Sequence, residues 1–167
     1  TVYAQSVNIS LEANSVTGSP TQMMSSESST FAGGSWICYS STGYFTLSAG
    51  DSLKTVYYKV RDAAQNVSAT VEGTITLDTT GPSIPSLVTP ANASTTNDAT
   101  PLLTWEASTD SGSGVVSYEI TVDTAVATQG AIASYTTGTL ADGAHTWNVR
   151  AKDATGNWGV PAARLGP

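Results

Sequence analysis

The sequence predicts an all-β protein that consists of two β-sandwiches in tandem. Apolar and polar residues alternate with a period of two in many short segments, which is the pattern of half-buried strands. Stretches rich in Gly, Pro, Asn and Ser separate these segments, as turns and loops do. One strand-and-loop pattern also occurs twice, in residues 56–66 and 147–157. The repeat indicates two copies of one β-domain plan.

In the first half, the alternation begins with Val7, Ile9 and Leu11, which share one face of an expected strand. Further strands are expected at residues 21–26, 36–39, 44–47, 56–60 and 67–77. Residues 27–35 form a polar excursion between two of them. Only five residues precede the first alternation. Because a sandwich needs its edges covered, the first domain is expected to be incomplete at its amino end.

A domain boundary is predicted at the segment Asp78 to Pro82. It follows the last strand of the first half, and Pro82 and Pro85 then interrupt any regular ladder because each lacks a backbone donor. The predicted domains are residues 1–80 and 81–167.

In the second half, a short edge strand is expected at residues 86–89 and a weaker strand at residues 131–137. Three longer strands carry inward apolar sets: Leu103, Trp105 and Ala107; Val116, Tyr118, Ile120 and Val122; and Trp147, Val149 and Ala151. Residues 158–165 close the domain, with Pro161 tolerated only on an edge strand.

The residues now allow a family resemblance to be stated. The first half carries Tyr-Tyr-Lys-Val-Arg-Asp-Ala-Ala-Gln-Asn and closes on Ile-Thr-Leu-Asp-Thr-Thr-Gly-Pro, and it resembles the bacterial immunoglobulin-like repeats of large surface and secreted proteins. The second half, with Leu-Thr-Trp-Glu, Val-Ser-Tyr-Glu-Ile and Trp-Asn-Val-Arg-Ala-Lys-Asp, is similar to fibronectin type III modules. The resemblance implies Ig-like/fibronectin type III-like β-sandwiches, which host many unrelated tasks. Two residues depart from the pattern: Gln65 replaces the usual loop glycine, and His145 stands near the place of an expected tyrosine.

Composition narrows the partner classes. Six Lys and Arg against 13 Asp and Glu give a formal net charge of −7, which disfavours nucleic acid and anionic membranes. No apolar run approaches the roughly 20 residues of a membrane helix. Only 11% of residues are charged, as in many secreted and cell-surface repeat proteins. The single cysteine, Cys38, lies in an apolar segment and is expected to be a small buried side chain.

A calcium site is the candidate metal centre. In a sandwich of this topology the incoming linker and two loops meet at one end, and in the second half these segments carry Asp78, Asp110, Asp153 and Asn157. Converging carboxylates suit a hard cation with 6 to 8 oxygen ligands. The alternative interpretation is that Asp153, like Asp62 in the first half, accepts backbone N–H bonds in a tight turn. The matching end of the first half holds Asn14, Asp62 and Asn66, which would be half a site.

Two further hypotheses concern aromatic residues and catalysis. Tyr57, Trp158 and Trp36 are candidates for a sugar-stacking platform, although such residues more often cover a sandwich edge. The only histidine, His145, lies three residues after Asp142, but no nucleophile elbow accompanies it. No catalytic residue is assigned, and the chain is expected not to be an enzyme.

The favoured function is that of structural spacer or adhesin-stalk modules in a secreted or cell-surface bacterial protein. Its expected partners are the other domains of the same polypeptide. The alternative is a carbohydrate- or protein-binding accessory module of a secreted enzyme. Because the first strand is expected to be missing, the sheet edge next to Val7–Leu11 is expected to be open, and a partner could add a strand there.

Overall fold

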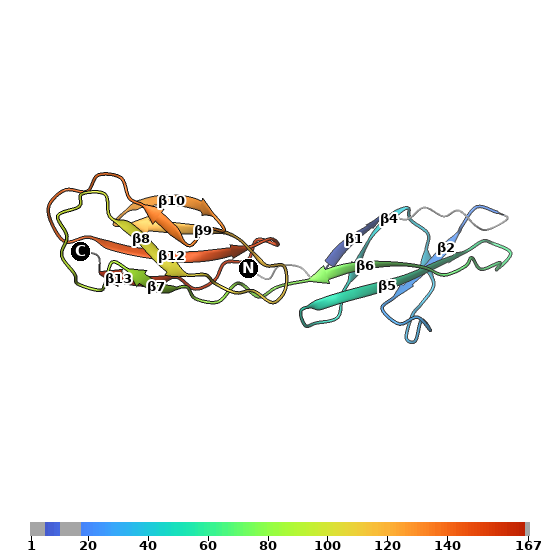
Figure 1. Cartoon of the computed structure of the whole chain (residues 1–167). Helices are drawn as coiled ribbons and strands as arrows, with labels where there is room; N and C mark the ends of the chain where they lie inside the picture. The colour runs from blue at the N-terminus through green and yellow to red at the C-terminus, as the bar shows by residue number, and fades with distance from the viewer. Residues whose placement is uncertain (1–5, 11–17, 166–167) are drawn as a thin grey trace. The chain divides into compact units, whose positions relative to one another are not determined.

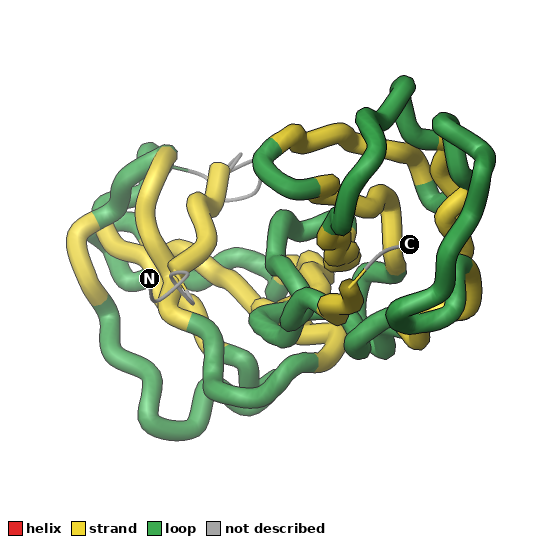
Figure 2. Tube along the Cα trace, turned by 90° about the vertical axis from the view of Figure 1, so that its left-hand side faces the viewer, coloured by secondary structure: helices red, strands yellow, loops and turns green. Residues whose placement is uncertain are grey.

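The structure, a computed structural model, describes residues 6–10 and 18–165; for residues 6–10 and 164–165 it describes the backbone only. All regular structure in the described residues is β, as Figure 2 shows by the absence of helix. No helix there is long and apolar enough to cross a membrane. The chain divides into two compact units, Thr1–Asp78 and Thr79–Pro167.

In its described residues the first unit has six strands (Figure 1): β1 (Ser6–Ser10), β2 (Gln22–Ser26), β3 (Ile37–Cys38), β4 (Thr42–Thr46), β5 (Ser52–Arg61) and β6 (Val71–Leu77). They pair antiparallel in two sheets, one of order β1-β4 and one of order β3-β2-β5-β6. Within the described residues β1 pairs only with β4, so it lies at an edge. The strand expected to be missing before Val7 would fall in residues 1–5, outside the described residues.

The core of the first unit lies on the face of β5 that carries Tyr58 and Val60. These residues are 7% and 2% exposed, and Met23 of β2 lies opposite Val60 in the ladder. The other face is also partly covered. There Met24 is buried, and a Cβ added to Gly34 would lie 2.9 Å from its sulfur. The expected polar excursion therefore folds back over the sheet.

Two expectations for the first unit are corrected. Cys38 is exposed, because β3 is an edge strand and Cys38 lies opposite Gln22, on the face that points away from the core. The last strand begins at Val71 rather than at Val67. Val67 makes only an isolated bridge to Arg61, and the Ser68 hydroxyl takes the place of a ladder partner by accepting the Val60 N–H at 3.0 Å.

As far as residue 165, where the description ends, the second unit has seven strands (Figure 1): β7 (Ser86–Thr89), β8 (Leu102–Glu106), β9 (Val115–Val122), β10 (Ala125–Gly130), β11 (Ser134–Thr136), β12 (Thr146–Asp153) and β13 (Ala162–Leu165). One sheet has the order β11-β8-β7 and the other β10-β9-β12-β13, and all described pairs are antiparallel. Pro161 lies just before the edge strand β13, which it can precede without removing a ladder bond.

The core of the second unit confirms seven of the ten predicted inward residues on three strands. The buried cluster is Leu103, Trp105, Tyr118, Ile120, Trp147, Val149 and Ala151. The rings of Trp105 and Tyr118 meet edge to face with centroids 5.2 Å apart. Burying a side chain of this size is worth about 1.5–3 kcal/mol, so these alternating positions dominate the stability of the unit.

Three expectations for the second unit are corrected. β10 was not expected, because its sequence Ala-Val-Ala-Thr-Gln-Gly is poor in strong strand formers. Val116 is 46% exposed, because the β9–β12 register shifts so that Asp153 pairs with Val115, and Val115 packs on the core instead. Ala107 is exposed, because β8 ends at Glu106.

The predicted repeat is visible in the structure. β5 and β12 hold the same third position in their four-stranded sheets. The isolated bridge Arg61–Val67 recurs as Lys152–Trp158, 91 positions later. Both units therefore end this strand in the same tight loop.

Candidate functional site

The loop that follows β12 is built around Asp153, which is fully buried. Its Oδ1 accepts hydrogen bonds from the backbone N–H of Gly156 at 2.7 Å and of Asn157 at 2.8 Å, and from the Thr155 hydroxyl at 3.0 Å. Its Oδ2 accepts from Nδ2 of Asn157 at 2.8 Å. Burial acts to raise the pKa of Asp153, but the hydrogen bonds outweigh it and hold the pKa below its usual value. Asp153 is therefore an ionised centre of a tight turn.

The loop between β8 and β9 is organised in the same way by Asp110. Its Oδ2 accepts from the backbone N–H groups of Gly112, Ser113 and Gly114 at 3.1, 2.9 and 2.8 Å. The Gly114 carbonyl then accepts the N–H of Ala154 at 3.1 Å, which joins this loop to the Asp153 loop. These bonds bring the two carboxylates to the same end of the second unit.

Asp78 completes the predicted set of carboxylates. It follows β6, is 7% exposed, and is bonded directly to Thr79, the first residue of the second unit. One carboxylate oxygen from each of Asp78, Asp110 and Asp153 lies within 4.8 Å of the other two. Three negative charges at this spacing repel one another, and a hard cation with oxygen ligands would neutralise them. Calcium binding stays a prediction.

Asn157, the fourth residue of the predicted site, acts as a donor in the turn. Its Nδ2 donates to Asp153 and, at 2.9 Å, to the Thr155 hydroxyl. The turn role that the sequence offered as the alternative to calcium, acceptance of backbone N–H bonds, is held by Asp153 itself.

The first unit repeats the turn at Asp62. The backbone N–H of Asn66 donates to Oδ1 of Asp62 at 2.9 Å, and its Nδ2 donates to Oδ2 at 2.8 Å. The side-chain bond from Asn66, followed by the backbone bond, lowers the pKa of Asp62. Asn14, the other residue of the expected half-site, lies outside the described residues. Gln65 has φ of 70° where the second unit has Gly156 at 102°, so glutamine takes a left-handed position that favours glycine.

The start of the second unit is held by close backbone packing. A Cβ added to Gly81 would lie 2.4 Å from the carbonyl oxygen of Trp158, and one added to Gly159 would lie 2.5 Å from that of Pro82. Two hydrogen bonds then join Ser83 to Thr109. The Ser83 N–H donates to the Thr109 carbonyl at 2.9 Å, and the Ser83 hydroxyl accepts from the Thr109 N–H at 2.9 Å. The chain is thus fixed to the second unit from Gly81 onward, and only two residues lie between Gly81 and Asp78.

Comparison with known proteins shows which proteins the chain is similar to. No protein-family model matches the chain. The chain is 40% identical over 106 residues to exoglucanase A of Cellulomonas fimi, 39% over 118 residues to chitinase A1 of Niallia circulans, and 43% over 88 residues to endoglucanase B of Cellulomonas fimi. These matches cover 62%, 66% and 48% of the chain. They span only 12%, 16% and 8% of those relatives.

A solved structure decides the fold. The fibronectin(III)-like modules of CbhA from Clostridium thermocellum match 97% of this chain and 84% of that chain, with a TM-score of 0.53 and 16% identity. The chain has a fibronectin type III-like fold. The predicted fold class, all-β with Ig-like/fibronectin type III-like sandwiches, is confirmed.

The histidine at the start of β12 fits a feature of this fold. Sandwiches of this kind often carry a tyrosine there, whose hydroxyl bonds back to the backbone a few residues upstream. Here Nε2 of His145 lies 2.9 Å from the Ala141 carbonyl, and Nδ1 lies 2.7 Å from Oδ2 of Asp123. Within the described residues the ring thus contacts an aspartate and a carbonyl rather than a serine. Sequence reasoning missed Asp123 because it meets His145 through the pairing of β9 with β12, where its N–H donates to the Thr146 carbonyl at 2.8 Å, and a contact between residues 22 positions apart leaves no local signal.

In the hypothetical sugar platform, one face of each tryptophan ring carries a basic side chain of the chain itself. The Arg61 guanidinium lies 4.4 Å above the Trp36 ring, and that of Arg150 lies 4.3 Å above the Trp158 ring. Each tryptophan belongs to a different fibronectin type III-like unit. One face of each ring is therefore taken by a cation–π contact.

Proposed function

We propose that the chain is a pair of non-catalytic modules that space and present other domains of a larger exported bacterial polypeptide. The observation that carries the proposal is the anchored start of the second unit, where Gly81 and Pro82 pack on the backbone of Trp158 and Gly159. Two residues, Thr79 and Thr80, remain between the first unit and this anchor. A connection this short suits a spacer better than a flexible tether.

The relatives support the same function. They are named as enzymes that act on glucans or chitin, and this chain matches a small part of each. An accessory position beside a catalytic domain, in a secreted or cell-surface protein, would account for that partial match. The more specific adhesin-stalk function has no such support.

The alternative, a carbohydrate-binding module, predicts a different outcome in a depletion assay. The purified chain is mixed with insoluble cellulose and with chitin, and the protein left in the supernatant is measured. A spacer remains in the supernatant, since the rings of Trp36 and Trp158 are stacked with Arg61 and Arg150. Retention on either polysaccharide that is lost in a Trp158→Ala variant would refute the spacer and establish the alternative.

We also propose that a calcium ion binds at the acidic cluster, which consists of Asp78, Asp110 and Asp153. Asp78, Asp110 and Asp153 would supply carboxylate oxygens, and water and backbone carbonyls would complete the shell. For an extracellular site with a Kd of roughly 10⁻⁴–10⁻³ M, 10 mM calcium would stabilise the fold by about 1–3 kcal/mol.

Thermal melts in calcium and in chelator test this proposal. The expected rise in melting temperature should disappear in Asp110→Asn and persist in Asp98→Asn, a control on a different loop. Identical melting temperatures in calcium and in chelator, with no heat of calcium binding in calorimetry, would refute the calcium proposal. The spacer proposal would be unaffected.

A further inference from the structure

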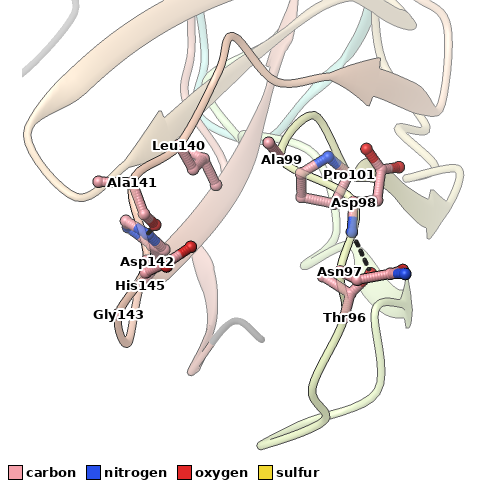
Figure 3. Close-up of a pocket in the computed structure, with 10 residues that line it drawn as sticks. All are labelled: Thr96, Asn97, Asp98, Ala99, Pro101, Leu140, Ala141, Asp142, Gly143 and His145. Atoms are coloured by element: carbon pink, nitrogen blue, oxygen red, sulfur yellow. Dashed lines mark hydrogen bonds between the residues drawn. The ribbon is translucent and has the colours of Figure 1, made fainter.

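A polar cleft lies in the second unit, away from the acidic cluster. It has a volume of about 280 Å³, and its two walls are residues 96–99 with Pro101, and residues 140–143 with His145. Figure 3 shows these walls facing each other, with Asp98 on one and Asp142 on the other. The walls are tied by a backbone bond in which the N–H of Leu140 donates to the carbonyl of Ala99 at 2.8 Å.

His145 fastens the second wall to the rest of the unit. Its Nε2 lies 2.9 Å from the Ala141 carbonyl, within that wall. Its Nδ1 lies 2.7 Å from Oδ2 of Asp123, in the two-residue turn between β9 and β10. Oδ1 of Asp123 also accepts the backbone N–H of Thr146 at 2.8 Å, which fixes the carboxylate. The ring therefore bridges two separate segments.

Both partners of the imidazole are acceptors. A carbonyl oxygen and an ionised carboxylate cannot donate, so each ring nitrogen must carry a proton for both bonds to exist. A neutral imidazole has only one N–H, and its other nitrogen would turn a lone pair toward an oxygen. The contact pattern is thus complete only for the imidazolium form.

The charged groups around the ring favour that form. Asp123 faces it from the β9–β10 turn, Asp142 lies on its own wall, and Asp98 lies across the cleft. In keeping with these contacts, the bonds to the Ala141 carbonyl and to Asp123 raise the pKa of His145, and the His145 bond lowers the pKa of Asp123.

We propose that His145 is a pH-sensitive latch: the imidazolium ties the wall at residues 140–143 to the β9–β10 turn, and loss of one proton releases that wall. A tyrosine at this corner would hold the same loop independently of pH near neutrality. Histidine makes the geometry of the cleft respond to pH.

The sign of the effect follows from the pKa of His145, which is higher in the folded chain than in the unfolded one. The latch is fully formed below the ordinary histidine pKa of about 6.5 and is lost as pH rises through the higher folded value. The polar cleft should therefore be most rigid in mildly acidic solution.

Nuclear magnetic resonance can test the latch on the whole chain, because His145 is the only histidine and its ring signal needs no further assignment. Its titration midpoint is expected above 6.5. At the same midpoint, the exchange of the Leu140 amide, corrected for intrinsic base catalysis, should accelerate roughly five- to tenfold, as for the loss of one hydrogen bond. A midpoint at or below 6.5, or constant Leu140 protection through the titration, would overturn the proposal.

Matched variants distinguish a pH-sensitive latch from a histidine that holds the loop independently of pH. His145→Gln and His145→Asn each retain a neutral amide donor, and the pH step in Leu140 exchange should vanish in both. Asp123→Asn keeps an acceptor and suits the φ of 53° at this position, and it should lower the His145 midpoint because the ring loses its charged partner. Asp98→Asn, which removes a charge across the cleft, should move the midpoint much less. If Asp123→Asn leaves the midpoint unchanged, the latch is refuted even if the histidine variants fail to fold.

Discussion

The interlocked glycines at the start of the second unit give the most direct prediction about its stability. In Gly81→Ala, the new Cβ would lie 2.4 Å from the carbonyl oxygen and 2.6 Å from the carbonyl carbon of Trp158. In Gly159→Ala, it would lie 2.5 Å from the Pro82 oxygen. Real Cβ contacts are not this short, and the obstructing atoms belong to the backbone. The segment at Gly81–Pro82 and the segment at Trp158–Gly159 must therefore move apart. Overpacking of this kind costs about 1–3 kcal/mol.

A melt followed by tryptophan fluorescence measures this cost in the correct unit, because Trp105, Trp147 and Trp158 all lie in the second unit and only Trp36 lies in the first. For a domain of about this size, each kcal/mol lowers the melting temperature by about 4–8 °C. Gly138→Ala is the matched control, since nothing lies within 4 Å of its added Cβ. If Gly81→Ala and Gly159→Ala melt like Gly138→Ala, the segment is not anchored as described.

Three other predictions concern the first unit. Gln65→Gly should stabilise it by about 1 kcal/mol, because φ of 70° strains a residue with a Cβ; a lower urea midpoint would contradict this. Because hydrogen bonds from Asn66 lower the pKa of Asp62, their contribution is present above the ordinary aspartate pKa of about 4 and is lost as pH falls through the folded value. Asp62→Asn should therefore weaken the acid sensitivity of unfolding, and an unchanged pH profile would argue against that role. Cys38 should react with a thiol reagent under native conditions at the rate of an exposed cysteine, whereas protection until unfolding would mean that it is buried.

The fold followed from the sequence where burial alone decides the pattern. Trp147, Val149 and Ala151 alternate on a central strand, and the structure buries all three. The pattern failed where the backbone departs from a regular ladder. Val116 continues the alternation of β9 in the sequence, yet the register shift opposite Asp153 turns it outward. Cys38 has apolar neighbours, but its position on a two-residue edge strand exposes it.

The candidate site divides in the same way. Asp62 and Asp153 were recognisable because they end matching strands at a constant offset, and topology alone placed Asp110 near Asp153. The Asp123–His145 pair was not recognisable. Its two residues are 22 positions apart and meet where the pairing of β9 with β12 places Asp123 beside Thr146. A side-chain contact between the end of one strand and the residue that precedes its neighbour leaves no local signal in the sequence.

Whether the chain is a spacer depends on how little its two units move about the short connection. Spin labels on the natural Cys38 and on a Thr128→Cys variant, both at exposed strand positions in different units, would give the distribution of distances between the units. With Gly81 onward fixed to the second unit, we expect one narrow peak, no broader than the label side chains themselves produce. A broad distribution over many distances would contradict a spacer and would leave two folded units on a flexible joint.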